Sequence, residues 1–473
     1  MKTLYVILGL IMVFGLSFLI AVLITPASFL ALEVVILGTF LFFYFLFRDA
    51  TNGLIIWLLS LLFTMFTKAP LGIDMPNLSL DRILYCFLVA YYFFHMARGK
   101  IYLSRRTTEI LMFILCALGI FSIISIKGIP FSRGSLDRYS LLFNSYVVPF
   151  SAFIIAKDFI NNEQKIHKLL IFLSFILLYL VMTSIFEHFK LNSLVFPRDI
   201  INPRMGIHFG RSRGPFLQSA VNGTVLSMLS VANLYMAINI RAPRKIFFVA
   251  IAILSPVAIF FTYTRAVWLA FLLSFVFMLF LNRKFRKYIA LLVFFGSIMM
   301  VPLHSKIVDM ERVTPRIYSL GPVHDRINLY YTYASMFKDK PFFGFGFGSF
   351  VYYSHEYFSK IKRSSLYNTA PPVIHDTFAG TIVELGSLGF LVFISILVSI
   401  FRKSFLVFRR LADEGFLGKG IVVIFWAMGI VYLFNASFID MKYHQFQNVL
   451  FYLMAGVISG LHNRRLINGK TDK

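Results

Sequence analysis

Four side chains in this sequence could bind and transform a phosphorylated substrate. His375 ends a long polar stretch, Ile307 to Ile374, and directly precedes an apolar segment. An imidazole titrates near neutrality and can act there as a general base. Arg211, Arg213 and Arg265 lie at the starts of two other apolar segments. Because a guanidinium offers a planar fork of donors that suits a phosphate or pyrophosphate, these residues predict a phosphate held beside a base.

Each of these residues also has a purely structural interpretation. An arginine at the end of an apolar helix can reach the lipid headgroups, and a histidine can simply finish a loop. Five other histidines on the same side of the expected membrane are alternative bases, and their spacing does not distinguish them from His375. They are His208, His304, His324, His355 and His444.

Two carboxylates follow the predicted base. Asp376 comes directly after His375, where either it or Thr377 could cap the next helix. Glu384 lies about two turns further along that helix. A carboxylate at this depth needs a cationic partner, and we expect one of the arginines to supply it. No Asp-x-Asp pair stands on the expected outer side, which agrees with a site without a metal ion, and no residue pattern calls for another cofactor.

The elements that carry these residues are expected to be membrane helices. Of the 473 residues, 59% are hydrophobic and only 14% are charged. The mean hydropathy of +0.78 lies far above that of soluble globular proteins. The two cysteines, Cys86 and Cys116, fall in different apolar segments, which indicates neither a disulfide framework nor a cysteine metal site. The sequence therefore predicts a polytopic membrane protein.

Apolar segments of spanning length predict an all-α fold with about 12–14 transmembrane helices. These segments are residues 4–24, 28–47, 53–67, 80–97, 108–126, 139–156, 167–186, 215–239, 246–262, 265–281, 288–304, 376–401, 421–434 and 445–461. The long interruption before His375 predicts one extracytoplasmic loop domain. The expected division is N-terminal helices (1–186), helices carrying the arginines (187–304), the loop domain (305–375), and C-terminal helices with a tail (376–473).

Positive charges indicate the cytoplasmic side of this arrangement. Lys and Arg number 46 against 21 Asp and Glu, a net charge of +25. Their dense clusters, which include Arg286 and Arg409, fall in every second connection when the N-terminus is inside. Both termini are then cytoplasmic, and the first apolar segment is a span rather than a cleavable signal. Topology and anionic headgroups account for the charge, so no nucleic-acid partner is predicted.

Glycine alternates with phenylalanine between Lys340 and Phe350 in the predicted loop domain. A nucleotide cradle does not fit, because no strand–turn–helix pattern surrounds the segment and the outer face has no nucleotide pool. Tight turns that lay aromatic rings against the membrane surface or a sugar fit better. Further aromatic residues follow, interleaved with Lys360, Lys362 and Arg363. This composition suits a glycan, an anionic lipid or an ordinary aromatic belt.

Several motifs, taken in order, resemble the bacterial O-antigen ligase and polysaccharide polymerase family. The motifs are Arg213-Gly214-Pro215-Phe216, Thr264-Arg265-Ala266-Val267-Trp268-Leu269-Ala270, Asp325-Arg326 followed by residues 341–350, and His375-Asp376-Thr377-Phe378 leading to Glu384-Leu385-Gly386-Ser387-Leu388-Gly389. The resemblance covers residues 204–440 and extends to the span number and the long outer loop. Ala266 and Asp376 depart from the family's usual glycine and asparagine, and neither change removes a group that the mechanism needs.

The resemblance implies a metal-independent inverting glycosyltransferase of the bacterial inner membrane. Such an enzyme takes a glycan from undecaprenyl pyrophosphate, with a loop histidine activating the acceptor hydroxyl and arginines binding the pyrophosphate. Carried over, this assigns catalysis to His375, pyrophosphate binding to Arg211, Arg213, Arg265 and Arg326, and support to Asp376 and Glu384. The implied partners are the lipid-linked donor, a glycan or lipid A core acceptor, the bilayer, and proteins such as a flippase and a chain-length regulator.

The acceptor distinguishes the members of this family. A polymerase adds the growing chain to the next lipid-linked repeat, a ligase moves a finished chain to a lipid A core, and a relative glycosylates protein hydroxyls. We favour a polymerase, because no extra outer domain is seen for a protein acceptor and the aromatic loop suits a sugar chain; the ligase is the alternative. A lipid-linked oligosaccharide flippase is a third interpretation. A transporter should place ionisable residues at mid-bilayer in several helices and show related halves, whereas here these residues gather at one face and no internal repeat is visible.

Overall fold

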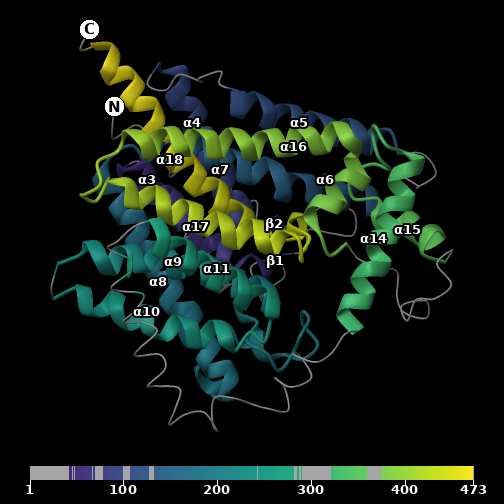
Figure 1. Cartoon of the computed structure of the whole chain (residues 1–473), viewed down its shortest axis with the longest axis horizontal. Coiled ribbons are helices and arrows are strands. Elements are labelled where there is room, and N and C mark those ends of the chain that lie inside the picture. The colour runs from purple at the N-terminus through teal and green to yellow at the C-terminus, as the bar shows by residue number, and fades with distance from the viewer. Residues whose placement is uncertain are drawn as a thin grey trace, which may run out of the picture. The chain divides into compact units, whose positions relative to one another are not determined.

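Helices make up nearly all of the structure, a computed structural model (Figure 1). It describes residues 42–44, 46, 48–66, 68–69, 78–99, 107–126, 133–241, 243–281, 285–286, 289, 321–359 and 374–471. The exceptions within this part are two strands of two residues each, β1 (Lys68–Ala69) and β2 (Leu78–Ser79), which pair antiparallel. The predicted all-helical class is therefore confirmed.

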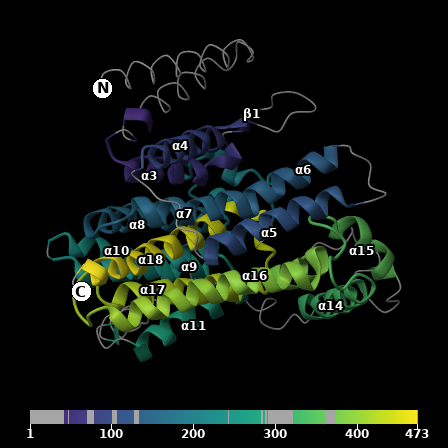
Figure 2. The same ribbon diagram turned by 90° about the horizontal axis from the view of Figure 1, so that it is seen from above.

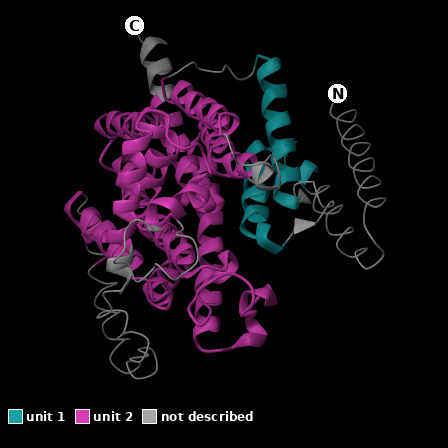
Figure 3. Cartoon of the chain, turned by 90° about the vertical axis from the view of Figure 1, so that its right-hand side faces the viewer, with its two compact units in different colours: residues 1–104 teal, residues 105–473 magenta. Residues whose placement is uncertain are grey.

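The chain divides into two compact units, Met1–Ser104 and Arg105–Lys473, which Figure 3 colours separately. In the described part of the first unit, α3 (Ala50–Leu62) packs against α4 (Leu80–Ala97), and the short η2 (Thr64–Phe66) follows α3. Helix α3 begins at a cap in which the Asp49 carboxylate accepts a hydrogen bond of 3.0 Å from the Thr51 N–H. The predicted site residues all belong to the second unit.

Six helical segments in the described chain are long and apolar enough to cross a membrane. They are α5 (Thr107–Ile124), the run Arg138–Phe159, α8 (Glu163–His188), α9 (Ser219–Asn239), α16 (Thr377–Arg410) and α17 (Lys419–Ala436). The second run joins the end of α6 (Arg133–Leu142), the π-helical η3 (Phe143–Val147) and α7 (Val148–Phe159).

Shorter or more polar helices complete the described set. Besides α3, the apolar helices α10 (Lys245–Phe260) and α11 (Arg265–Leu281) fall below spanning length, and α18 (Gln445–Thr471) extends from the last connection. Most of these bounds lie within five residues of the predicted spans, but α16 and α18 continue well beyond the predicted ends at residues 401 and 461. The predicted segment 4–24, and most of 28–47 and 288–304, lie outside the described residues, so the total of 12–14 spans stays a prediction.

Helix α9 lies at the centre of the second unit, where it packs against α8, α10, α11 and α17. Three of its hydroxyl-bearing residues are compatible with this position because each donates to a carbonyl one turn back in the helix. Thr224, Ser227 and Ser230 donate to the carbonyls of Ala220, Gly223 and Leu226 at 2.8, 2.8 and 2.6 Å. These three hydroxyls are therefore satisfied within a buried helix.

Two glycines in α18 allow it to pack closely against α7. A Cβ added to Gly460 would lie 2.6 Å from the carbonyl oxygen of Lys157, and a Cβ on Gly456 would collide with the carbonyl of Phe153. Small residues at such positions let two helix backbones approach each other in a membrane. The sequence therefore determines this packing locally, through residues that have no side chain.

Helices α14 (Gly321–Asp339) and α15 (Phe350–Ser359) form the described part of the long loop. Both lie beyond one end of α5 and α16, as two perpendicular views show (Figures 1 and 2). Leu329, Met336, Phe345 and Phe350 pack there into a small hydrophobic core that also contains Val383 of α16. The loop is therefore a folded element with its own core; residues 305–320 and 360–373 lie outside the described part.

The glycine–phenylalanine segment docks into a break in α16. Gly386 leaves the helical conformation with φ of 67° and ψ of −172°. The loop completes the interrupted hydrogen bonding: the N–H groups of Phe345 and Gly346 donate to α16 carbonyls at 3.0 and 2.8 Å, and the N–H of Ser387 donates to the Pro341 carbonyl at 2.8 Å. Exchange of backbone hydrogen bonds in both directions holds the segment on the helix.

The rings of this segment do not all have the predicted exposure. Phe342 and Phe343 are exposed, as expected for rings that meet a membrane or a sugar. Phe345, Phe347 and Phe350 are instead buried, and Phe347 packs against Tyr146, with 5.6 Å between ring centroids. The expectation was therefore wrong for the last three rings, because the turns at the glycines direct them into the protein.

Candidate functional site

Four of the predicted site residues line one cavity of about 450 Å³. Arg211 comes from the connection between α8 and α9, Arg265 begins α11, Arg326 lies on α14, and His375 directly precedes α16. Further walls come from the turn before α11, from the end of α17 and from the residues that follow α17. The residues there are Tyr263, Thr264, Phe434, Phe438 and Ile439. Segments distant in the sequence thus meet around the predicted base, and we call this space the arginine cavity.

Backbone hydrogen bonds bring Arg211 and Arg265 to the same cavity. The α8–α9 connection contains the short helices η4 (Asn192–Leu194), η5 (Arg198–Ile201) and η6 (Gly214–Phe216). The N–H of Ser212 donates to the Phe261 carbonyl at 3.0 Å, which joins this connection to the turn between α10 and α11. In that turn Tyr263 has a left-handed φ of 48°. The tight turn reverses the chain, so that Arg265 starts the next helix at the cavity wall.

One face of α14 docks against the start of α16. Arg326, Tyr330 and Tyr333 share this face because they are spaced by four and then three residues. The Tyr330 hydroxyl donates to Asp376 Oδ2 at 2.8 Å, and the N–H of His375 donates to the Tyr333 hydroxyl at 3.3 Å. These two contacts place Arg326 and His375 on the same cavity.

Asp376 caps α16. Its Oδ1 accepts hydrogen bonds from the N–H groups of Phe378 at 2.8 Å and Ala379 at 2.9 Å, while Oδ2 accepts the Tyr330 hydroxyl. Burial, aided by this hydrogen bond, raises the pKa of Tyr330 to about 12, so the phenol remains a donor. Of the two predicted caps the structure therefore shows Asp376, and its carboxylate holds the backbone that carries His375.

The arginine cavity is strongly cationic. Arg211, Arg265 and Arg326 line it, and no carboxylate does so among the described residues. Burial lowers the pKa of Arg326; Tyr330 and Asp376 oppose this shift, and the charge of Arg265 adds to it. The Arg326 guanidinium also lies 4.5 Å from the centroid of the Phe438 ring. Because guanidiniums gathered around a cavity repel one another, this arrangement favours an anionic ligand.

Arg213 does not contribute to this cavity. It is 1% exposed, and its guanidinium donates to the carbonyls of Ile200 at 2.7 and 3.0 Å, Asn202 at 2.6 Å and Met205 at 2.5 Å. Its own N–H donates to the Glu187 carboxylate at 3.1 Å. The side chain thus holds the α8–α9 connection together. Its guanidinium donates to these backbone carbonyls and does not line the arginine cavity, so we do not include Arg213 among the proposed pyrophosphate ligands.

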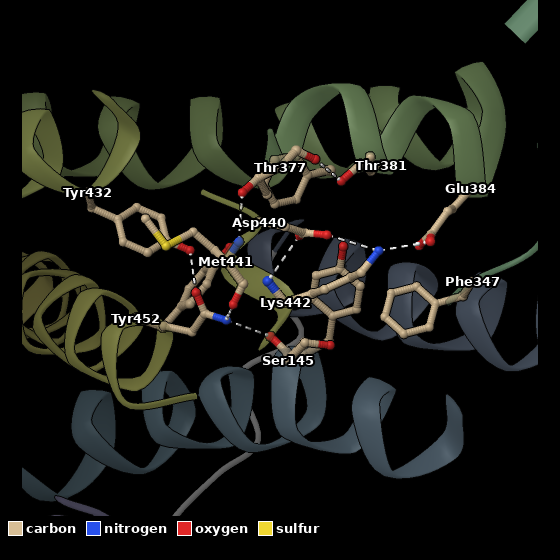
Figure 4. A pocket seen from close by; sticks show the side chains of 14 residues that line it. Ser145, Phe347, Thr377, Thr381, Glu384, Tyr432, Asp440, Met441, Lys442 and Tyr452 are labelled. Atoms are coloured by element: carbon tan, nitrogen blue, oxygen red, sulfur yellow. Dashed lines mark hydrogen bonds and ion pairs between the residues drawn. The ribbon is translucent and has the colours of Figure 1, made fainter. Parts of the chain in front are cut away.

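The partner of Glu384 is Lys442 and not one of the arginines. Lys442 Nζ lies 2.8 Å from Glu384 Oε1 and 3.0 Å from Asp440 Oδ2, and all three side chains are buried (Figure 4). Burial alone would lower the pKa of Lys442, but the charges of Asp440 and Glu384 outweigh burial and raise it. The sequence-based pairing was therefore wrong, because α16 turns Glu384 towards the α17–α18 connection.

The buried triad Glu384–Lys442–Asp440 also fixes the glycine–phenylalanine segment. Glu384 accepts hydrogen bonds from the N–H groups of Gly348 at 3.0 Å and Phe350 at 3.3 Å. Lys442 and Asp440 belong to the turn around η8 (Met441–Tyr443). The sequence contains a signal for this pair. Asp440 and Lys442 carry opposite charges and lie two residues apart in a short connection between two apolar segments, where ionisable residues need partners.

The alternative histidines differ in whether they line the arginine cavity. His208 lines the arginine cavity with His375, and its Nδ1 lies 3.2 Å from the Ser219 hydroxyl. His355 is exposed on α15, and His444 follows η8; neither lines the cavity. His304 and the side chain of His324 lie outside the described residues. Geometry therefore leaves His375 and His208 as the described histidines at the cationic site.

Comparison with known proteins matches part of the chain to one family. Residues 247–394 match the family described as O-antigen ligase (Wzy_C). The matched region contains Arg265, Arg326 and His375, whereas Arg211 precedes it. No curated protein matches the chain. Members of the family are glycan-transferring enzymes that use lipid-linked glycans. The chain is therefore a multi-pass membrane protein in which residues 247–394 are similar to the O-antigen ligase family.

Proposed function

We propose that this protein is a glycosyltransferase of the bacterial inner membrane that moves a glycan from undecaprenyl pyrophosphate to an acceptor hydroxyl. The observation that carries the proposal is the arginine cavity, in which three guanidiniums and His375 surround one space of about 450 Å³. A cavity of this volume is in the range of small-ligand sites. Its charge suits a pyrophosphate, and its histidine can take a proton from an acceptor.

The proposed reaction is a single displacement at the anomeric carbon. The acceptor oxygen forms a bond to this carbon as the bond to the pyrophosphate oxygen breaks, so the configuration inverts. The acceptor proton passes to the His375 imidazole, and the bonding electrons leave with the pyrophosphate. Since pyrophosphate is already a stable leaving group, the enzyme has mainly to orient the acceptor, remove its proton and neutralise charge on the departing oxygens.

Arg211, Arg265 and Arg326 would neutralise that charge. Arg265 is the first residue of α11, and Ala266 also lines the cavity, so the N–H groups of the first helical turn contribute positive potential at the same wall. Guanidiniums that bind the two phosphates make a divalent cation unnecessary. We therefore propose that transfer is independent of metal ions.

The proposed active site lies on the extracytoplasmic side. Helix α16 has 34 residues, with His375 directly before its start and Arg409 and Arg410 at its end. At 1.5 Å per residue a continuous helix of this length is roughly 51 Å long, which is an upper limit for the distance between these ends because of the break at Gly386. Basic residues concentrate on the cytoplasmic side of membrane proteins, which supports an outward-facing His375 and cytoplasmic chain ends.

Among the possible acceptors we favour the next lipid-linked repeat, which makes the protein a polymerase of O-antigen or exopolysaccharide. The support is the aromatic surface of the loop, where Phe342 and Phe343 are exposed. The family description supports a second candidate, a ligase that transfers the finished chain to a lipid A core.

Purified protein incubated with a lipid-linked repeat tests both candidates. Ladders of increasing length without a second acceptor indicate a polymerase, whereas transfer only after addition of lipid A core indicates a ligase. A parallel reaction in EDTA should run at the same rate. No transfer to either acceptor, or a dependence on magnesium or manganese, contradicts the proposal.

A further inference from the structure

A second open cavity lies next to the buried triad, with Gly348 and Tyr443 in its lining. It has a volume of about 450 Å³ and is lined by residues of α6, η3, α15 and η8. Tyr352 and Tyr443 contribute rings that are 49% and 42% exposed. Arg138, Ser140 and Asn144 contribute polar groups. We call this space the tyrosine cavity, and the transfer reaction described above makes no use of it.

One short segment, residues 438–443, contributes lining residues to both cavities. Phe438 and Ile439 line the arginine cavity, and Tyr443 lines the tyrosine cavity. In the same segment Asp440 and Lys442 belong to the buried triad, and their ion pairs hold the segment in place (Figure 4). A ligand group held in the tyrosine cavity is therefore separated by packed side chains from the group that reacts at His375.

The same triad braces the floor of the tyrosine cavity. Gly348 lines the cavity and donates its N–H to Glu384. Its φ is +72°, and a Cβ at this position would lie 2.9 Å from Cγ of Arg138. The backbone therefore packs directly on the buried arginine stem. This support gives the cavity a shape that does not depend on a bound ligand.

The charge of the tyrosine cavity differs from that of the arginine cavity. Of the described residues that line it, Arg138 alone carries a charge, and its guanidinium lies 5.8 Å from the centroid of the Tyr352 ring. The nearby Lys442 is already paired with two carboxylates. One guanidinium beside an aromatic ring is a poor match for a pyrophosphate, which prefers several cations. The lining instead suits a ligand with many uncharged polar groups.

The individual groups of the lining match those of a sugar. Exposed tyrosine rings offer flat apolar faces against which the C–H face of a pyranose can stack, and their hydroxyls can exchange hydrogen bonds. Asn144 and Ser140 add an amide and a hydroxyl, and Asn144 Oδ1 is buried with no hydrogen-bond partner among the described residues. A buried acceptor of this kind is stabilised when a ligand hydroxyl or a water donates to it.

We propose that the tyrosine cavity binds a saccharide unit of the glycan at a distance from the reacting end, and so retains long chains on the enzyme. The retention of long chains rests on the proposed glycan transfer, whereas saccharide binding in this cavity can be measured without transfer. It also gives a role to the aromatic residues of α15, which the transfer site itself does not use.

Binding of free oligosaccharide tests the proposal directly. The probe is the repeat oligosaccharide released from its lipid, as a monomer and as a tetramer, added to protein in a detergent without a sugar headgroup. Saturation-transfer NMR and calorimetry should show that Tyr352→Ala and Tyr443→Ala each weaken tetramer binding by roughly tenfold, the effect of one lost aromatic contact. Tyr352→Phe, which keeps the ring, should bind within about threefold of the unsubstituted protein.

Two control variants make the result specific. Tyr331→Ala removes a tyrosine that is 62% exposed on α14 and does not line the tyrosine cavity, so it should leave binding unchanged. His375→Ala should also leave free-oligosaccharide binding unchanged. In the transfer assay, Tyr352→Ala should shorten the products while the first transfer keeps its rate. Equal losses in Tyr352→Ala and Tyr331→Ala, or unaltered tetramer binding in Tyr352→Ala and Tyr443→Ala, would overturn the proposal. An absence of transfer by unsubstituted protein contradicts the proposed function alone.

Discussion

Gly344 and Gly386 meet backbone to backbone, so closely that a Cβ on Gly344 would lie 2.6 Å from the N atom of Gly386. Both residues have a left-handed φ, +68° and +67°. The contact seats the outer loop in the break of α16, about three turns after His375. The loop, the break and the proposed base are thus parts of one rigid arrangement.

Substitution of either glycine should destabilise the protein. Gly386→Ala and Gly344→Ala each combine a strained φ with a backbone collision, and we expect a loss of roughly 2–4 kcal/mol in unfolding free energy. Gly415→Ala is the matched control, because Gly415 has a φ of +94° but nothing within 4 Å of an added Cβ. Thermal unfolding in detergent provides the comparison, and an equal shift for Gly415→Ala would remove the role assigned to the loop contact.

Removal of Lys442 should cost more than removal of Asp440. Lys442→Met leaves the Glu384 and Asp440 carboxylates buried together, and breaking a buried pair in this way costs about 3–5 kcal/mol. Asp440→Asn leaves the lysine with Glu384 and should be milder. Adding Glu384→Gln to Lys442→Met should recover part of the loss, because one uncompensated charge disappears. Unfolding midpoints of the three variants measure these effects, and an equally stable Lys442→Met would contradict the triad.

Arg213 and Arg265 should differ in what their loss affects. Arg213→Ala removes the donors that hold the carbonyls of Ile200, Asn202 and Met205, so limited proteolysis should cut the α8–α9 connection faster. Arg265→Ala should leave proteolysis unchanged and weaken binding of the lipid-linked donor. Arg265→Lys should rescue donor binding poorly, because an ammonium cannot replace the guanidinium fork. Normal donor binding by Arg265→Ala would contradict its assignment to the pyrophosphate.

Loss of the proposed base should affect turnover rather than donor binding. His375→Ala should reduce single-turnover transfer by roughly 10²–10⁴, the usual contribution of a positioned general base. Donor binding should stay within about threefold, because the guanidiniums are unaltered. His208→Ala is the informative comparison, since His208 lines the same cavity. If His208→Ala abolishes transfer while His375→Ala does not, the base is His208.

Cysteine labelling tests the orientation of the site. In a background with Cys86 and Cys116 replaced by serine, single cysteines at positions 355 and 375 should react with an impermeant reagent in intact spheroplasts, as should one at position 211. Cysteines at positions 286 and 409 should react only after permeabilisation. The native residues at 286, 355, 375 and 409 are all exposed, so failure to label would reflect sidedness rather than burial. Labelling of position 375 from the cytoplasmic side would end the assignment of an outward-facing site.

The bounds of most described helices were predictable because they depend on local composition. A span requires about 20 apolar residues, and glycine, proline and charged residues interrupt such runs, so α4, α9, α11 and α17 begin and end close to the predicted positions. The placement of His375, Arg211, Arg265 and Arg326 at one end of the helices also follows from sequence, since charge distribution indicates the side of the membrane.

Tertiary structure decided which of these side chains meet. Arg211 and Arg213 are two residues apart and chemically identical, yet Arg211 faces the cavity and Arg213 is enclosed by the carbonyls of the same connection. The difference arises from turn geometry, in which Gly214 adopts a φ of +52°, and from the hydrogen bond between Ser212 and Phe261 of another segment. The pairing of Glu384 with Lys442 likewise joins positions 58 residues apart (442 − 384), and the break at Gly386 depends on a loop that supplies the missing hydrogen bonds. Such choices depend on contacts between distant segments, and residue type and spacing do not specify which side chains meet.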